Sequence, residues 1–319
     1  MKPIKSILSA VLIGALASLA TPAISEEFTI GYSQFWGTNP FLITMTDGAR
    51  KAISEWEAKG VNVDLIVTNG GDTDPTKQVA DVEDLYAQGV DGLIMFPGDS
   101  SILAKPVKDL YNPSAKPVVI TDVGLNSGVV ETFIVTDNYK GGQMAAEILA
   151  GALPPGAKVV SFNHSPGIQA LVDRQRGFED RARELGLSVQ PEISLTLSLE
   201  NGRRAMEDAL TSMPDLAGAY SGNQVIALGA ASALASSNRT DVKLVTFDID
   251  PVSYAAIKDG AIQGAVVQDP FRMGYEGMNA VLTKLTGGVP EPKLEILPVK
   301  LTRENAADFA QNPQIAGSN

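Results

Sequence analysis

The sequence predicts an α/β protein built from two similar lobes, each a doubly wound parallel sheet. Short runs of β-branched and apolar residues alternate with amphipathic segments along the chain, which is typical of parallel sheets covered by helices. About ten such runs occur, more than one small open sheet usually holds, so we expect two sheets. The alternation restarts near Pro154-Pro155-Gly156, where the composition breaks, and the two halves therefore look like structural duplicates.

Each strand is expected where a short apolar run is bounded by turn residues. The expected strands are Phe28–Ser33, Val63–Thr68, Gly92–Phe96, Val118–Thr121, Thr132–Val135, Lys158–Phe162, Val189–Leu195, Ala217–Tyr220, Lys243–Phe247 and Gly264–Val267. Helices are expected between them, near 40–59, 75–88, 101–111, 139–151, 168–185, 201–212, 223–235, 251–259 and 270–286. In the first helix, apolar residues recur every three or four positions, which predicts a face directed to the core.

The N-terminal segment has the pattern of an export signal. Lys2 and Lys5 precede the apolar run Ile7–Leu19, and the small residues Ala23-Ile24-Ser25 form a cleavage step. We therefore expect residues 1–25 to be a signal peptide that is cleaved near Ser25, which places the mature protein in the periplasm. The apolar run is too short for a membrane-spanning helix.

The charge and the absence of cysteine exclude several classes of function. The chain contains no Cys, so it forms no disulfide, thiol nucleophile or Cys-ligated metal site, and it cannot be lipidated at a cysteine. Its formal net charge of −12 disfavours nucleic acid and anionic membrane surfaces as partners. With His164 as its one histidine and no nucleophile or phosphate-loop motif, the chain carries no sign of catalytic residues, a metal or a cofactor.

Polar side chains recur directly after the expected strands. In doubly wound sheets, ligands bind beyond the carboxyl ends of the strands. Each of these residues could also be a helix cap, which is the structural alternative for each one taken singly. Together they would form a rim that suits a polyhydroxylated ligand, because carboxylates accept hydrogen bonds and amides both donate and accept them. The residues are Asn39, Asp122, Asp137, Asn223, Asp248 and Gln268.

One arginine and one tryptophan complete the predicted rim. Arg174 shares a helix face with Phe178, whereas Arg176 points elsewhere and is expected to be solvated. Trp36 lies in a loop with no periodicity that would place it in a core, and a flat ring suits the apolar face of a sugar.

Several motifs together resemble periplasmic substrate-binding proteins of the ribose-binding type, the soluble components of sugar ABC importers. The matching segments are Asn39-Pro40-Phe41, Val82-Glu83-Asp84-Leu85-Tyr86-Ala87-Gln88-Gly89-Val90-Asp91-Gly92-Leu93-Ile94, Asp137-Asn138-Tyr139-Lys140-Gly141-Gly142, Arg174-Gln175-Arg176-Gly177-Phe178, Asn223, Phe247-Asp248 and Gln268-Asp269-Pro270. They span nearly the whole mature chain in the expected order.

The resemblance implies a type I periplasmic-binding fold whose two lobes are joined by a three-segment hinge and close around one ligand. Its crossings would lie near Asp137, Gln268-Asp269 and Ile296-Leu297. The N-terminal lobe would then comprise residues 26–136 plus 269–295, and the C-terminal lobe residues 137–268 plus 296–319, so the break at Pro154 is only approximate. By the same likeness the ligand contacts include Asn39, Phe41, Asp122, Arg174, Asn223, Asp248 and Gln268, in a protein that acts as a monomer.

Three departures from the ribose pattern bear on the ligand. Leu42 stands where ribose binders commonly have a second aromatic residue, Val123 where they have a polar or basic one, and no aromatic residue occurs near Leu195–Leu199. Trp36 would supply the missing stacking surface. A pentose, another monosaccharide or a smaller polyol all remain open.

The implied function is capture of a monosaccharide or polyol and its delivery to an ABC permease in the inner membrane. A second hypothesis is an accessory that presents its ligand, including autoinducer-like furanosyl compounds, to a periplasmic sensor or chemoreceptor. A third is an exported glycosidase, because two carboxylates suffice for glycoside hydrolysis.

Overall fold

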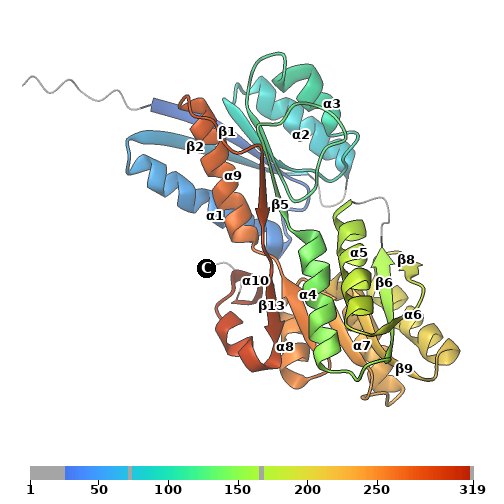
Figure 1. Cartoon of the computed structure of the whole chain (residues 1–319). Coiled ribbons are helices and arrows are strands. Elements are labelled where there is room, and N and C mark those ends of the chain that lie inside the picture. Colours follow the sequence, from blue (N-terminus) through green and yellow to red (C-terminus); the bar gives the residue numbers. More distant parts are fainter. Residues whose placement is uncertain (1–25, 71–73, 165–168, 317–319) are drawn as a thin grey trace, which may run out of the picture.

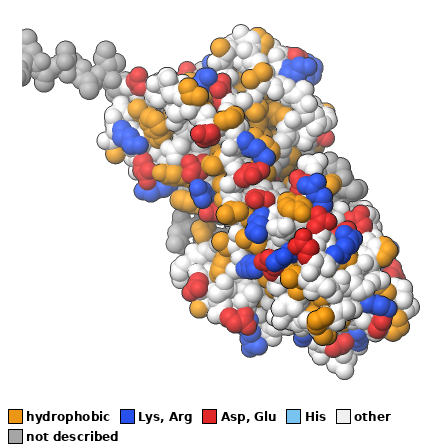
Figure 2. All heavy atoms as spheres, viewed as in Figure 1, with side chains coloured by type: hydrophobic (Ala, Val, Ile, Leu, Met, Phe, Trp, Pro, Cys, Tyr) orange, Lys and Arg blue, Asp and Glu red, His pale blue; other side chains and the backbone are white. Residues whose placement is uncertain are grey.

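The computed structural model describes residues 26–70, 74–164 and 169–316 of the chain, which form two α/β lobes joined at a narrow waist (Figure 1). The expected signal peptide lies outside the described residues. Within the described ranges, no helix combines the length and apolar character needed to cross a membrane. On the face shown in Figure 2, acidic and basic side chains are interspersed over both lobes.

The first lobe contains a six-stranded sheet in which every neighbouring pair is parallel, in the order β12-β5-β4-β3-β1-β2. Its strands are β1 (Glu26–Gln34), β2 (Val61–Asn69), β3 (Gly92–Phe96), β4 (Val118–Thr121), β5 (Thr132–Thr136) and β12 (Lys293–Ile296). Its helices are α1 (Pro40–Glu57), α2 (Pro75–Ala87), α3 (Ala104–Pro106), the π-helical turn η1 (Val107–Tyr111) and α9 (Pro270–Leu285). Apolar side chains of α1 and α9 cover one face of the sheet and form a buried core with Ile30, Ile94 and Ile134.

The second lobe repeats this plan. Its sheet has the order β13-β11-β10-β9-β6-β7, with β8 also paired to β6 and β13 antiparallel to β11. Its strands are β6 (Lys158–His164), β7 (Ser188–Val189), β8 (Ile193–Leu195), β9 (Leu216–Ser221), β10 (Lys243–Phe247), β11 (Gly264–Val267) and β13 (Val299–Thr302). Its helices are α4 (Asn138–Gly151), α5 (Gln169–Glu184), α6 (Leu199–Ser212), α7 (Gln224–Ser236), α8 (Pro251–Asp259), the 3-10 helix η2 (Arg303–Phe309) and α10 (Pro313–Ala316). The expectation of two similar doubly wound lobes is confirmed.

Some expected elements differ from the structure. The single strand predicted over Val189–Leu195 is two short strands, because Pro191 between them cannot donate a ladder hydrogen bond. The strands β12 and β13 and the segments η2 and α10 were not predicted. Pro154 does not divide the lobes, since α4 before it already packs on the second sheet.

The chain crosses between the lobes three times. It passes from β5 into α4, returns from β11 into α9, and passes again from β12 to β13. Ile296, which the sequence analysis assigned to the C-terminal lobe, pairs with Thr136 in the first sheet, so the third crossing begins after it. The carboxyl ends of the parallel strands in both sheets therefore face the waist.

Paired glycines let helices approach closely in both lobes. A Cβ at Gly48 of α1 would lie 1.9 Å from the Phe271 carbonyl oxygen of α9, and a Cβ at Gly274 of α9 would lie 1.8 Å from that of Met45. The second lobe repeats this at α4 and α5: a Cβ at Gly142 would lie 2.0 Å from the carbonyl oxygen of Arg174. The backbones that carry the waist-facing residues are thus held at fixed separations.

We predict that Gly274→Ala destabilises the protein by about 1–3 kcal/mol, because a methyl group there meets backbone atoms that cannot yield without separating α1 from α9. Gly277→Ala on the same helix is the matched control. A Cβ there would lie 3.5 Å from Ile94, an ordinary contact, so the change should be neutral or stabilising by up to about 1 kcal/mol. Urea unfolding of both variants measures the difference, and equal stabilities would contradict it.

Candidate ligand-binding site

The two lobes enclose a cavity of about 500 Å³ at the waist, here called the cleft cavity. From the first lobe it is lined by residues that follow β1 and β4 and by the last residue of β3. From the second lobe it is lined by residues of α5 and α10 and by those that follow β9, β10 and β11. The lining residues used below are Trp36, Asn39, Phe41, Phe96, Asp122, Leu171, Arg174, Asn223, Gln224, Asp248, Gln268 and Gln314. This volume is within the usual range for small-molecule sites.

The structure brings together all the predicted rim residues except one. Trp36, 42% exposed, lies at the cavity, whereas its neighbour Phe35 packs against Gly98, where a Cβ would clash with the ring. Asp137 does not line the cleft cavity. Its carboxylate caps α4 by accepting a hydrogen bond from the Lys140 N–H at 2.9 Å, and it borders a neighbouring cavity instead. The reason is that β5 leads directly into a hinge crossing, so the residue after it starts α4.

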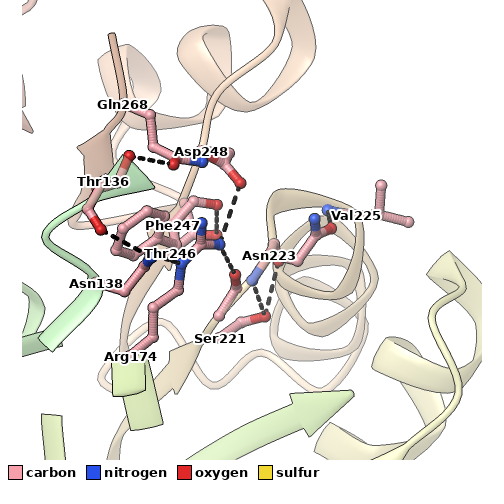
Figure 3. A network of polar contacts seen from close by, with 11 residues as sticks. Thr136, Asn138, Arg174, Ser221, Asn223, Val225, Thr246, Phe247, Asp248 and Gln268 are labelled. Atoms are coloured by element: carbon pink, nitrogen blue, oxygen red, sulfur yellow. Dashed lines mark hydrogen bonds and ion pairs between the residues drawn. The ribbon is translucent and has the colours of Figure 1, made fainter. Parts of the chain in front are cut away.

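A closed circuit of hydrogen bonds, here called the polar ring, includes three of the residues that line the cavity (Figure 3). Its members are Thr136, Asn138, Arg174, Asp248 and Gln268. Arg174 donates from Nε to Asn138 Oδ1 at 2.7 Å and from Nη1 to Asp248 Oδ2 at 3.5 Å. Gln268 Nε2 donates to Asp248 Oδ1 at 2.7 Å, and the Thr136 hydroxyl donates to Gln268 Oε1. Asn138 Nδ2 donates to the Thr136 carbonyl oxygen at 2.9 Å and closes the circuit.

The buried charge of Arg174 requires the hydrogen bonds of the polar ring. Arg174 is 5% exposed, and its guanidinium stacks over the Phe247 ring with 3.7 Å between the guanidinium carbon and the ring centroid. Its Nη1 also donates to the Gly222 carbonyl oxygen at 3.1 Å. A buried cation requires such partners, because removing it from water is otherwise costly.

Several polar atoms at the cavity remain uncommitted. Asn39 and Asn223 each cap a helix through Oδ1, which accepts from the N–H of Phe41 and of Val225. The capping role and the binding role are therefore compatible, since each amide keeps its Nδ2 donors. Within the described part of the chain, Nδ2 of both amides and Nη2 of Arg174 have no hydrogen-bond partner.

Asp122 and Asp248 occupy equivalent places in the two lobes. Asp122 follows β4 with φ of 61° and donates its N–H to the Ile134 carbonyl oxygen, and Asp248 follows β10 with φ of 65° and donates to that of Val266. A positive φ is uncommon for residues other than glycine, and such conformations cluster at functional sites. Both backbones turn sharply, which directs both carboxylates to the cavity.

The two carboxylates differ in their partners. Asp248 has Arg174 and Gln268, but burial still raises its pKa, with both partners opposing the shift. Burial raises the pKa of Asp122 to about 6; the charge of Arg174 opposes the shift and that of Asp248 adds to it. Among the described residues, Asp122 Oδ1 is buried without a hydrogen-bond partner. Asp122 is therefore an acceptor that a bound hydroxyl group could satisfy.

Further residues that line the cavity were not expected from the sequence, among them Phe96, Gln224 and Gln314. Phe96 is apolar and is the last residue of β3, so the rule that selected polar residues directly after the strands did not select it. Gln224 follows Asn223, and its Oε1 is buried without a partner in the described part of the chain. Gln314 lies in the C-terminal tail, to which the sequence analysis assigned no function.

In residues 26–70, 74–164 and 169–316, no group of three or more His, Cys, Asp or Glu side chains is arranged to hold a metal ion. Carboxylates, amides and one arginine beside aromatic rings instead match a neutral ligand with many hydroxyl groups.

Comparisons with known proteins agree with this chemistry. The family model of the periplasmic binding protein domain matches residues 30–288. The ribose import binding protein of Bacillus subtilis is 36% identical over 249 residues, which are 78% of this chain and 79% of that protein. A carbohydrate transporter solute-binding protein from Agrobacterium radiobacter, solved with D-arabinose, is 29% identical with a TM-score of 0.74, covering 92% of this chain and 99% of its own. A periplasmic ribose ABC transporter structure from Conexibacter woesei shares the fold, with a TM-score of 0.83 at 22% identity, covering 90% of this chain and 96% of its own.

We predict that Asp122→Asn stabilises the ligand-free protein at pH 7.5 by about 1–3 kcal/mol. The pKa of Asp122 is higher in the folded state, at about 6, than its ordinary value of 3.8. Folding therefore takes up a proton between these values, and the free energy of unfolding falls as the pH rises from about 4 to about 6. Asparagine removes this loss and tolerates a positive φ.

Chemical unfolding at pH 4 and pH 7.5 tests this prediction, with Asp64→Asn at an exposed position as the control. The advantage of the Asp122→Asn variant should shrink toward zero at pH 4. A variant that is less stable than the wild type at pH 7.5 would contradict the burial of a charged, unpaired carboxylate.

Proposed function

The chain belongs to the periplasmic binding protein family, and on that premise we propose that it captures a monosaccharide or polyol between its lobes and delivers it to an ABC permease. The observation that carries this proposal is the set of uncommitted donors and acceptors that both lobes direct at one cavity. Asp122 and Asn39 come from the first lobe, and Arg174, Asn223 and Gln224 from the second. The similarity to proteins that import ribose or bind arabinose supports the same class of ligand.

The ligand would lie with an apolar face against the first lobe. Trp36, Phe41 and Phe96 supply aromatic surface there, whereas the second lobe supplies the cation and most of the amides. A pyranose has C–H groups on its faces and hydroxyl groups at its edge, so this division suits it. Val123, which stands where ribose binders commonly have a polar or basic residue, lines the cavity, and Leu171 adds apolar surface from the second lobe.

Closure of the lobes would follow from binding. A ligand that contacts both lobes binds the closed state more tightly, and only that difference in affinity can shift the population toward closure. We propose that residues 26–136 plus 269–296 and residues 137–268 plus 297–319 move as the two bodies, because Ile296 pairs with the first sheet. The closed shape would be what the permease recognises.

The cellular setting is part of the proposal. Residues 1–25 would direct export and be removed near Ser25, leaving a monomer in the periplasm. A sensor or chemoreceptor that docks the closed form is the alternative partner. Co-purification of the sugar-loaded protein with the permease or with a sensor ectodomain distinguishes the two.

A thermal-shift screen of the mature protein tests the class of ligand. The panel is D-ribose, D-arabinose, D-allose, D-tagatose, myo-inositol and xylitol. A compound at one hundred times its dissociation constant should add about 2.7 kcal/mol to the stability of the folded state. The chain has two tryptophans, and Trp56 is held away from the cavity by its hydrogen bond to Asn279, so a fluorescence change that Trp36→Phe abolishes would report contact at Trp36.

We predict that Arg174→Ala and Asp248→Asn each weaken the best binder of that panel by about 2–5 kcal/mol, because each leaves a buried polar partner unsatisfied. Arg176→Ala is the matched control, since that side chain lies on the same helix and is 61% exposed. Calorimetric titration gives the affinities. Unchanged affinity in both site variants would remove them from the site. Release of product from a chromogenic glycoside would instead support the glycosidase hypothesis.

A further inference from the structure

The chain continues past β13 into a short C-terminal segment, residues 303–316, that is anchored on the second lobe. Tyr254 of α8 donates its hydroxyl hydrogen to the Ala306 carbonyl oxygen at 2.8 Å, and both residues are buried. Phe309 and Ile315 pack against the core of the same lobe. At the start of the segment, Asn305 caps η2 by accepting the Thr302 N–H at 2.7 Å. The segment is therefore a built part of the lobe.

Its last helix, α10, also reaches the first lobe. It contacts α8 of the second lobe and α1 of the first, and Figure 1 shows it at the waist beside the crossings. A smaller cavity of about 180 Å³ lies there, bordered by Thr44 of α1, by Asp269 and Leu297 of the second and third crossings, and by Pro313 of α10. Any hinge motion that moves α1 relative to α8 must therefore change the contacts of α10.

Gln314 of α10 is the residue that connects this segment to the ligand. It lines the cleft cavity together with Arg174 and Asp248, and it is 4% exposed. Its Nε2 donates to the carbonyl oxygen of Gln268, the hinge residue of the polar ring, at 3.4 Å. Its backbone is held as well, because the Gln314 N–H donates to Asn312 Oδ1 at 2.9 Å. Among the described residues, no donor reaches Gln314 Oε1.

We propose that the C-terminal segment forms a third wall of the cleft and that Gln314 determines ligand specificity by accepting a hydrogen bond from a sugar hydroxyl through Oε1. This inference rests on the function proposed above. A buried amide with one end fixed on the hinge and the other end unpartnered at the cavity has the geometry for this contact. The side chain also lines the cavity, so it limits the size of the sugar that fits.

Two effects follow from Gln314→Ala. Loss of one hydrogen bond should weaken the best-bound sugar by about 5- to 30-fold. The space released should also favour a hexose over the matching pentose. D-allose in its pyranose form is D-ribopyranose with one added hydroxymethyl group, so the ratio of their affinities should move at least about threefold toward D-allose. Simple loosening of the fold would weaken both sugars alike and leave the ratio unchanged.

The experiment is calorimetric titration of D-ribose, D-arabinose, D-allose and D-tagatose into mature wild type, Gln314→Ala, Gln311→Ala and Arg174→Ala. Gln311 is the matched control, because it is the same residue type three positions earlier and is exposed. Thermal unfolding of each variant accompanies the titrations. We expect Gln314→Ala to lose affinity and to change the D-allose to D-ribose ratio, and Gln311→Ala to behave as the wild type.

The outcomes separate this inference from the function on which it rests. Loss of binding in Arg174→Ala with unchanged affinities in Gln314→Ala would overturn the role of Gln314 and leave the proposed function intact. An equal loss for all sugars, with a lowered melting temperature, would overturn the specificity role. A wild type that binds none of the four sugars would overturn both proposals.

Discussion

The buried pairing of Arg174 with Asp248 and Asn138 is the interaction on which the rest of the site depends. It neutralises a cation that is almost fully removed from water, and breaking such a pair by removing one member typically costs about 3–5 kcal/mol. The same circuit includes Thr136 at the first hinge crossing and Gln268 at the second. A ligand that binds Arg174 or Asp248 therefore acts on groups bonded directly to the hinge. In the proposed mechanism, these contacts link ligand binding to lobe movement.

Each lobe carries an aspartate with a positive φ after the equivalent strand, but the two side chains have different hydrogen-bond partners. Asp122 and Asp248 share their place after the strand, their positive φ and the hydrogen bond of their N–H to the next strand. Asp248 is bound by Arg174 and Gln268, whereas Asp122 keeps a buried oxygen without a partner in the described chain. In the second lobe, Arg174 and Gln268 thus hold the Asp248 carboxylate in place before a ligand binds. In the first lobe, the Asp122 carboxylate has an oxygen without a partner, and burial raises its pKa. The charged carboxylate therefore lowers the stability of the ligand-free protein, as is common for groups at binding sites.

The sequence could predict the fold and most of the candidate site because both follow from local rules. Apolar alternation gave the central strands, and the strand-end rule selected Asp122 and Asp248, which the sheets then bring to one cavity. The same alternation missed β12 and β13, since edge strands such as Lys293–Ile296 carry charges that hide the apolar pattern. Asp137 satisfied the rule but starts a helix at a crossing. Gln314 could not be found locally, because only the tertiary path of the tail brings it to the hinge.

Small-angle X-ray scattering of the mature protein, with and without the tightest-binding sugar at saturation, tests the central claim most directly. If polar groups from both lobes bind one ligand, the radius of gyration should decrease on addition of the sugar. The decrease should be smaller in Asp248→Asn at the same sugar concentration, because the weaker affinity expected of that variant leaves less of the protein occupied. An unchanged radius in the wild type, at a concentration where calorimetry shows full occupancy, would contradict binding across the cleft and place the ligand on one lobe alone.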